Sequence, residues 1–193
     1  MPIGLFGGSF DPIHHGHLIV ARSALEQLGL DEVRFVPARE QPFKVGTHGA
    51  AASHRARMVE LAIEGEPGFR LERTELERSG PSFTVDTLRA LHAREPGVEW
   101  TLLLGEDTVR DLPKWREPEA VAQLARIAVF ARPGTPAPAP MEPAWRRIRV
   151  PLVEISATEV RRRVREGHSI RYWVPDAVAA YVTANGLYRD DGT

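Results

Sequence analysis

The sequence lacks cysteine, a long apolar run and an excess of charge of either sign. Without cysteine it has no disulfides, thiolate metal sites or cysteine nucleophiles, a composition that fits an intracellular enzyme. The N-terminus shows neither a basic leader nor an apolar segment long enough to span a membrane, so we expect a cytoplasmic protein with no membrane partner. A net charge of −1 provides no global field to attract nucleic acid, so no nucleic-acid partner is expected.

Short apolar runs alternate with amphipathic segments along the whole chain. Strand, helix and strand joined by short connections indicate parallel pairing through right-handed crossovers. We therefore predict one α/β domain over residues 1–193, a doubly wound, Rossmann-like parallel sheet of about five or six strands flanked by helices. A helical segment is expected at 156–188, and an exposed Pro- and Ala-rich connector at 133–143. The predicted strands are 3–6, 32–37, 69–71, 100–104, 127–130 and 147–153, and the predicted helices are 18–28, one capped by Ser53, 85–93, 156–166 and 175–185.

The most informative stretch is the glycine-rich loop from Gly7 to His17, which lies between the first predicted strand and the first predicted helix. Gly7 and Gly8 are expected to allow positive φ and close approach to a ligand. The free N–H groups of the helix N-terminus would then face the loop and form an anion site.

Two histidines in this loop, His14 and His17, are three residues apart and would share one face of the first helical turn. Together with backbone N–H groups they would form a donor array suited to phosphate oxygens. Two other interpretations remain open at this point: surface histidines beside an ordinary helix cap, and a metal-binding pair. The metal pair is disfavoured because the spacing is three and no acidic residue lies between the histidines.

The loop Gly7-Gly8-Ser9-Phe10-Asp11-Pro12, followed by His14-x-Gly16-His17, resembles the signature of the nucleotidylyltransferase superfamily. The whole chain, through its closing Gly186-Leu187-Tyr188, is similar to bacterial nicotinate-nucleotide adenylyltransferases. A second segment, Ile155-Ser156-Ala157-Thr158 with Arg161, resembles the second nucleotide motif of these enzymes, and Ser156 is a natural helix N-cap. The resemblance implies that His14 and His17 are catalytic and that ATP contacts Gly7, Gly8, Ser9, Phe10, His14, His17, Ile155, Ser156, Thr158 and Arg161.

The same resemblance implies a site for the acceptor nucleotide, formed by Lys44, Ser82, Thr84, Asp107, Trp115 and Arg132. Thr84 would meet the nicotinate carboxylate and Trp115 would stack on the pyridine ring. The segment at Lys44 departs from the family pattern, because it reads Gln-Pro-Phe-Lys where the family has Pro-Pro-His-Lys. Read without the resemblance, Ser82 and Thr84 could equally be a helix cap, and Trp115 a core residue.

The resemblance implies an enzyme that joins ATP and nicotinate mononucleotide, giving nicotinate adenine dinucleotide and pyrophosphate in NAD biosynthesis. Magnesium would enter with the ATP, and no separate metal site is expected. The alternatives are a superfamily transferase acting on nicotinamide mononucleotide or phosphopantetheine, and a non-catalytic nucleotide-binding module. The sequence leaves the oligomeric state open, a homo-oligomer included.

Overall fold

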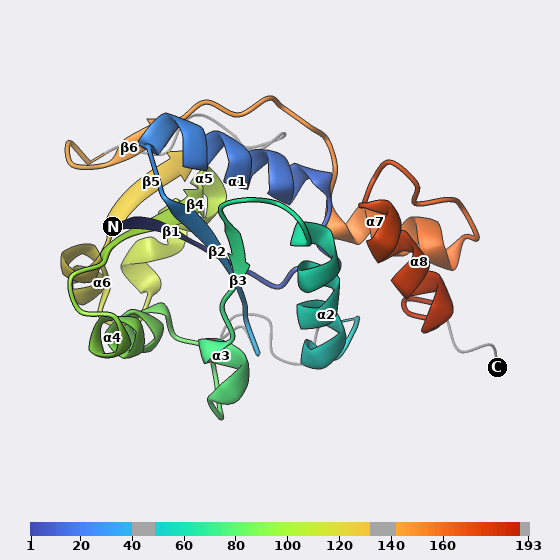
Figure 1. Cartoon of the computed structure of the whole chain (residues 1–193), viewed down its shortest axis with the longest axis horizontal. Coiled ribbons are helices and arrows are strands. Elements are labelled where there is room, and N and C mark those ends of the chain that lie inside the picture. Colours follow the sequence, from blue (N-terminus) through green and yellow to red (C-terminus); the bar gives the residue numbers. More distant parts are fainter. Residues whose placement is uncertain (40–48, 132–141, 190–193) are drawn as a thin grey trace.

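The computed structural model describes residues 1–39, 49–131 and 142–189, and its centre is a six-stranded, wholly parallel sheet (Figure 1). Every neighbouring pair of strands runs parallel, which confirms the predicted doubly wound fold. Across the sheet the strands are β3 (Phe69–Leu71), β2 (Glu32–Pro37), β1 (Pro2–Gly8), β4 (Glu99–Gly105), β5 (Arg126–Phe130) and β6 (Arg146–Ile148).

Helices cover both faces of the sheet and extend beyond one end of it. In Figure 1, α1 lies on one side of the strands and α4 and α6 on the other, while α7 and α8 lie together beyond α2. The helical elements are α1 (His15–Leu28), α2 (Ala52–Ile63), α3 (Thr74–Glu77), α4 (Thr84–Arg94), α5 (Glu106–Asp111), the 3-10 turn η1 (Leu112–Lys114), α6 (Pro118–Leu124), α7 (Ala157–Arg165) and α8 (Asp176–Ala184). Over the described residues, no helix combines the length and the apolar composition needed to cross a bilayer.

Alternation of side chains along the strands produces two apolar cores, one on each face of the sheet. The first core joins residues of α1, α2, α7 and α8, and includes Phe6 and Phe35. The second joins residues of α4, α5 and α6, and includes Leu88 and Leu104. The C-terminal helices therefore share a core with the helix that follows the glycine-rich loop.

Two predicted boundaries were wrong, the first at the start of α2 and the second where a distant residue ends the last strand. Ser53 does not cap α2, because the helix already begins at Ala52 and its N-cap is Ala51. The last strand ends at Ile148 instead of continuing to residue 153. Beyond Ile148, the backbone N–H of Arg149 donates to Oε1 of Gln27 on α1 (3.0 Å) and its carbonyl accepts from Nε2 of Gln27 (2.7 Å), so this residue pairs with a helix side chain.

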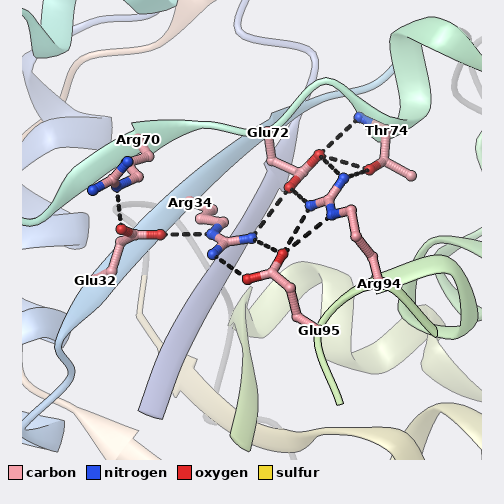
Figure 2. A network of polar contacts seen from close by, with 7 residues as sticks. All are labelled: Glu32, Arg34, Arg70, Glu72, Thr74, Arg94 and Glu95. Carbon is pink, nitrogen blue, oxygen red and sulfur yellow. Dashed lines mark hydrogen bonds and ion pairs between the residues drawn. The ribbon is translucent and has the colours of Figure 1, made fainter. Parts of the chain in front are cut away.

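An ion-pair network connects β2, β3 and the end of α4 on the second face of the sheet (Figure 2). Nη1 and Nη2 of Arg34 contact the two carboxylate oxygens of Glu95 at 2.6 and 2.7 Å, and Nε of Arg34 contacts Glu32 at 2.6 Å. Arg94 bridges Glu72 and Glu95 in the same network. The bidentate geometry favours the ionised carboxylate, so Arg34 holds the pKa of Glu95 at about 2.

Candidate active site

The strand order reverses between β1 and β4, and the loops that follow these strands form the switch point where doubly wound sheets bind ligands. The glycine-rich loop follows β1, and Asp107 lies in the first turn of α5, directly after β4. The topology therefore brings together two of the segments that sequence reasoning assigned to nucleotide and acceptor.

The positive φ in the glycine-rich loop belongs to Phe10 (φ 47°), whereas Gly7 and Gly8 keep ordinary backbone angles, contrary to the prediction. Phe10 is buried, and its ring lies edge-on to Phe6 and Phe35. A Cβ on Gly8 would lie 3.1 Å from this ring, so Gly8 is required for space. Burial of the Phe10 side chain stabilises the turn and leaves its backbone as the part that a ligand would meet.

The imidazoles of His14 and His17 stack on each other, with ring centroids 3.7 Å apart and an angle of 24° between the planes. His14 is the N-cap of α1 and is buried, while the ring of His17 lies edge-on to Phe10 at 5.0 Å. Nδ1 of His17 accepts a hydrogen bond from the backbone N–H of His14 (3.2 Å). A neutral His17 therefore carries its proton on Nε2, which makes Nε2 a donor.

Gly16 gives the histidine pair its space. A Cβ at this position would lie 3.0 Å from Nδ1 and 3.1 Å from Cε1 of His14, closer than ordinary van der Waals contact. A larger residue between the two histidines would therefore require the ring of His14 to shift by a few tenths of an ångström.

The first turn of α1 offers fewer N–H groups to an anion than the sequence predicted. The N–H of His15 already donates to the carbonyl of Trp173 (3.1 Å), and that of His17 donates to the carbonyl of His14 (2.9 Å). The chain between α7 and α8 therefore covers part of this helix end. Binding of phosphate oxygens here would depend more on the imidazole side chains than on the backbone.

The second motif lies against the first, as the resemblance implied. Ser156 is the N-cap of α7, and its Oγ accepts from the N–H of Glu159 (3.1 Å), which confirms the predicted cap. The carbonyl of Ile155 lies 3.7 Å from the Cβ position of Gly16, and Thr158 is exposed in the first turn of α7. Nη1 of Arg161 donates to the backbone carbonyl of Asp11 (2.7 Å). The structure thus brings Ile155 and Arg161 to the histidine loop.

Sequence reasoning missed two buried charged residues that connect the loops of this site. The carboxylate of Asp11 accepts hydrogen bonds from the N–H groups of Gly49 (2.7 Å) and Ala50 (3.1 Å). Arg55 on α2 donates to the carbonyls of Ser9 (2.6 Å), Arg39 (3.1 Å) and Ala50 (3.2 Å). Desolvation lowers the pKa of Arg55. An arginine within the apolar pattern of the helix was the available sequence signal for this role.

The predicted acceptor residues Ser82 and Thr84 lie at the start of α4, beside the end of β2. Oγ of Ser82 accepts from the N–H of Arg39 (3.2 Å), and the buried carboxyl of Glu75 accepts from Oγ1 of Thr87 on α4 (2.9 Å). Thr84 is the first residue of α4 and is half-buried. Ser82 therefore has a structural role whatever it binds, and burial raises the pKa of Glu75 beneath it.

Of the other four residues predicted to bind the acceptor nucleotide, the structure describes Trp115 and Asp107. Trp115 is half-buried and packs, together with Phe83, against the second core, so it lies on the same side of the sheet as the start of α4. Asp107 is exposed on α5. The predictions for Lys44 and Arg132, and for most of the 133–143 connector, lie outside the described residues. Among the described residues, no group of three or more His, Asp or Glu side chains could hold a metal ion.

Comparison with known proteins agrees with this geometry. The model of the cytidylyltransferase-like family matches residues 5–163, a span that includes both histidines and the segment from Ile155 to Arg161. The chain therefore belongs to the cytidylyltransferase-like family and is a nucleotidyltransferase.

Relatives that match over nearly their whole length indicate the group of nucleotidyltransferases to which the chain belongs. A protein of Thermus thermophilus is 49% identical over 192 residues, covering 98% of this chain and 100% of its own, and a protein of a Roseiflexus species is 47% identical over 197 residues, covering 97% and 98%. Both are named "probable nicotinate-nucleotide adenylyltransferase", and this chain belongs to that group. The nicotinic acid mononucleotide adenylyltransferase of Plasmodium falciparum, solved with NaAD, has the same fold at a TM-score of 0.79 and 22% identity, over 97% of each chain.

Proposed function

We propose that this enzyme transfers the adenylyl group of ATP to nicotinate mononucleotide, releasing pyrophosphate and forming nicotinate adenine dinucleotide for NAD biosynthesis. The observation that carries the proposal is the stacked pair of His14 and His17 at the switch point, with Arg161 of the second motif held against the same loop. The names of the full-length relatives support the choice of acceptor.

In the proposed reaction, a phosphate oxygen of the mononucleotide attacks the α-phosphorus of ATP. A new P–O bond forms while the bond between the α-phosphorus and the oxygen bridging to the β-phosphorus breaks, and pyrophosphate leaves with that bond's electron pair. Nε2–H of His17 donates to a phosphate oxygen and stabilises the charge that develops there. Arg161, Ser156, Thr158 and the backbone of residues 7–10 hold the triphosphate, which needs no covalent enzyme intermediate.

The acceptor is proposed to bind between the start of α4 and α5. Thr84 would donate to the nicotinate carboxylate, Trp115 would stack on the pyridine ring, and Asp107 would contact the ribose or the mononucleotide. Lys44 and Arg132 are retained as proposed contacts on the family resemblance alone. Nucleotidyltransferases of this family generally use a divalent metal ion with ATP, and we propose that magnesium fills this role, bound to the triphosphate.

The first test is release of pyrophosphate from ATP and magnesium, with nicotinate mononucleotide compared with nicotinamide mononucleotide. A strong preference for the acid supports the proposed acceptor and the donor role of Thr84. Equal use of both would contradict that specificity, and turnover with neither would contradict the proposed reaction.

The second test separates the two histidines of one turn. His17→Ala should lower kcat by about 10²–10³, the usual cost of removing one donor to a developing oxyanion. His15→Ala is the matched control, since the backbone bond from His15 to Trp173 does not require its side chain and His15 is not part of the stacked pair. Near-normal turnover of folded His17→Ala would overturn the proposed role of His17.

A further inference from the structure

The closing segment of the chain reaches back into the active site through one tyrosine. The hydroxyl of Tyr188 donates to Oδ1 of Asp11 (2.7 Å), although the two residues are 177 positions apart. Both are buried, with 8% and 3% of their surfaces exposed. Positive φ at Gly186 (61°) and Tyr188 (64°) turns the chain after α8 so that the ring points inward.

Arg161 meets the same aspartate from another element. Its Nη1 donates to the backbone carbonyl of Asp11 and lies 3.8 Å from Oδ2 of the carboxylate. A Cβ on Gly49 would lie 3.0 Å from both Cδ of Arg161 and Cδ1 of Tyr188, so the arginine stem and the tyrosine ring pack side by side over this glycine. Tyr188, Asp11, Gly49 and Arg161 therefore form one packed cluster.

We infer that Tyr188 is a positioning residue for adenylyl transfer, because its bond to Asp11 holds the loop against which Arg161 is oriented toward the triphosphate. The inference rests on the proposed function, which assigns Arg161 to the phosphates. Without the hydroxyl, Asp11 would keep its bonds to Gly49 and Ala50, and Oδ1 would lose the shorter of its two hydrogen bonds, the one that ties it to the C-terminal segment. Arg161 would then sample more orientations before ATP binds.

The electrostatics of the cluster favour a hydroxyl that remains a donor. Burial raises the pKa of Tyr188, and the negative charge of Asp11 acts in the same direction. The phenol therefore stays protonated at neutral pH. The charge of Asp11 is faced by Arg161 and, from α2, by Arg55.

The test is Tyr188→Phe in the wild-type and Arg161→Ala backgrounds, with KM for ATP, KM for nicotinate mononucleotide, kcat and Tm measured for each protein. In the wild-type background, Tyr188→Phe should raise KM for ATP by about three- to tenfold, the factor expected from one hydrogen bond, and leave KM for the mononucleotide unchanged. In the Arg161→Ala background, the same change should alter KM for ATP by less than about twofold, because the residue being positioned is gone.

Tyr181→Phe is the matched control for a structural effect. It removes another hydroxyl of the C-terminal region, one that pairs with Nδ1 of His54 (2.9 Å) and joins α8 to α2 without touching Asp11 or Arg161. This variant should lower Tm and keep the KM for ATP. Gly49→Ala is an independent check that retains the Tyr188 hydroxyl while its Cβ displaces Arg161 and Tyr188, and it should also raise KM for ATP.

The outcomes separate the inference from the proposed function. If Arg161→Ala raises KM for ATP while Tyr188→Phe and Gly49→Ala do not, the positioning role is overturned and the phosphate role of Arg161 stands. If Tyr188→Phe changes KM for ATP by the same factor in both backgrounds, its effect is general and the inference is again overturned. If Arg161→Ala binds ATP normally, the proposed role of Arg161 fails, and the inference fails with it.

Discussion

Gly16→Ala separates the geometry of the histidine pair, to which we assign the catalysis, from the stability of the helix that carries it. The added Cβ would lie 3.0 and 3.1 Å from two atoms of the His14 ring, so this ring must move by a few tenths of an ångström. The ring cannot move freely, because His17 stacks on it at 3.7 Å. Displacement of His14 therefore pushes His17. Since a misplacement of about 1 Å can cost about 100-fold in rate, we expect kcat to fall by roughly tenfold or more.

The same substitution should leave the fold intact. Gly16 lies in α1, and alanine in a helix is more favourable than glycine by up to about 1 kcal/mol. Pyrophosphate release and thermal denaturation would be measured on Gly16→Ala and on Glu26→Ala, an exposed control position of the same helix. Wild-type kcat in folded Gly16→Ala would refute the argument that ring placement limits the reaction. A rate loss accompanied by a large fall in Tm would refute the separation of geometry from stability.

Two carboxyl groups should make stability depend on pH in opposite directions. Arg34 lowers the pKa of Glu95 to about 2, so this pair stabilises the fold above the unfolded pKa of about 4.5 and loses that contribution as pH falls toward 2. Urea unfolding should find Glu95→Gln less stable than wild type by about 1–3 kcal/mol at pH 7, with the gap narrowing below pH 4.5 and closing toward pH 2; a gap independent of pH would contradict this. Burial raises the pKa of Glu75, so its ionisation opposes folding as pH rises above about 4.5. The Tm of Glu75→Gln minus that of wild type should therefore increase as pH rises from 4 to 8. A decrease over that range would show that the hydrogen bond from Thr87 to the ionised carboxylate outweighs the cost of burying its charge.

The sheet could be predicted because its signals are local. Runs such as Trp100 to Leu104 are apolar on both faces, which only a strand covered by two layers of helices can satisfy, and the structure places them in β4. Ser156 could be predicted as a cap because a serine hydroxyl at a helix start accepts a hydrogen bond from an N–H three residues further on, here that of Glu159. The error at the last strand arose because a distant partner decided the outcome: Arg149 pairs with Gln27 on α1 and so leaves the sheet.

The histidine pair shows which features of a site residue spacing can predict and which it cannot. Spacing predicted that His14 and His17 share a face, and their stacked rings confirm it. Spacing could not predict that Gly16 makes room for the first ring, because that contact depends on the rotamer of His14. One backbone donor expected at this helix end is occupied for a non-local reason, since the carbonyl of Trp173, far along the chain, accepts from the N–H of His15.

Buried charges were the least predictable part of the site, and physical chemistry explains why. A charge inside a protein is tolerated only when its partners compensate for lost water, and for Asp11 and Arg55 the hydrogen-bond partners are mostly backbone groups, with one hydroxyl and the charge of Arg161 facing Asp11. Backbone partners leave no residue-type signal, so the sequence offers Arg55 within the apolar pattern of α2 and Asp11 within the loop motif, but not the groups that they bind. Because they bind backbone groups, Asp11 and Arg55 also connect loops: Asp11 binds the N–H of Ala50 and Arg55 binds its carbonyl. Removing either charge would leave Ala50 with one attachment fewer, so Asp11 and Arg55 act together on the geometry of the proposed nucleotide site.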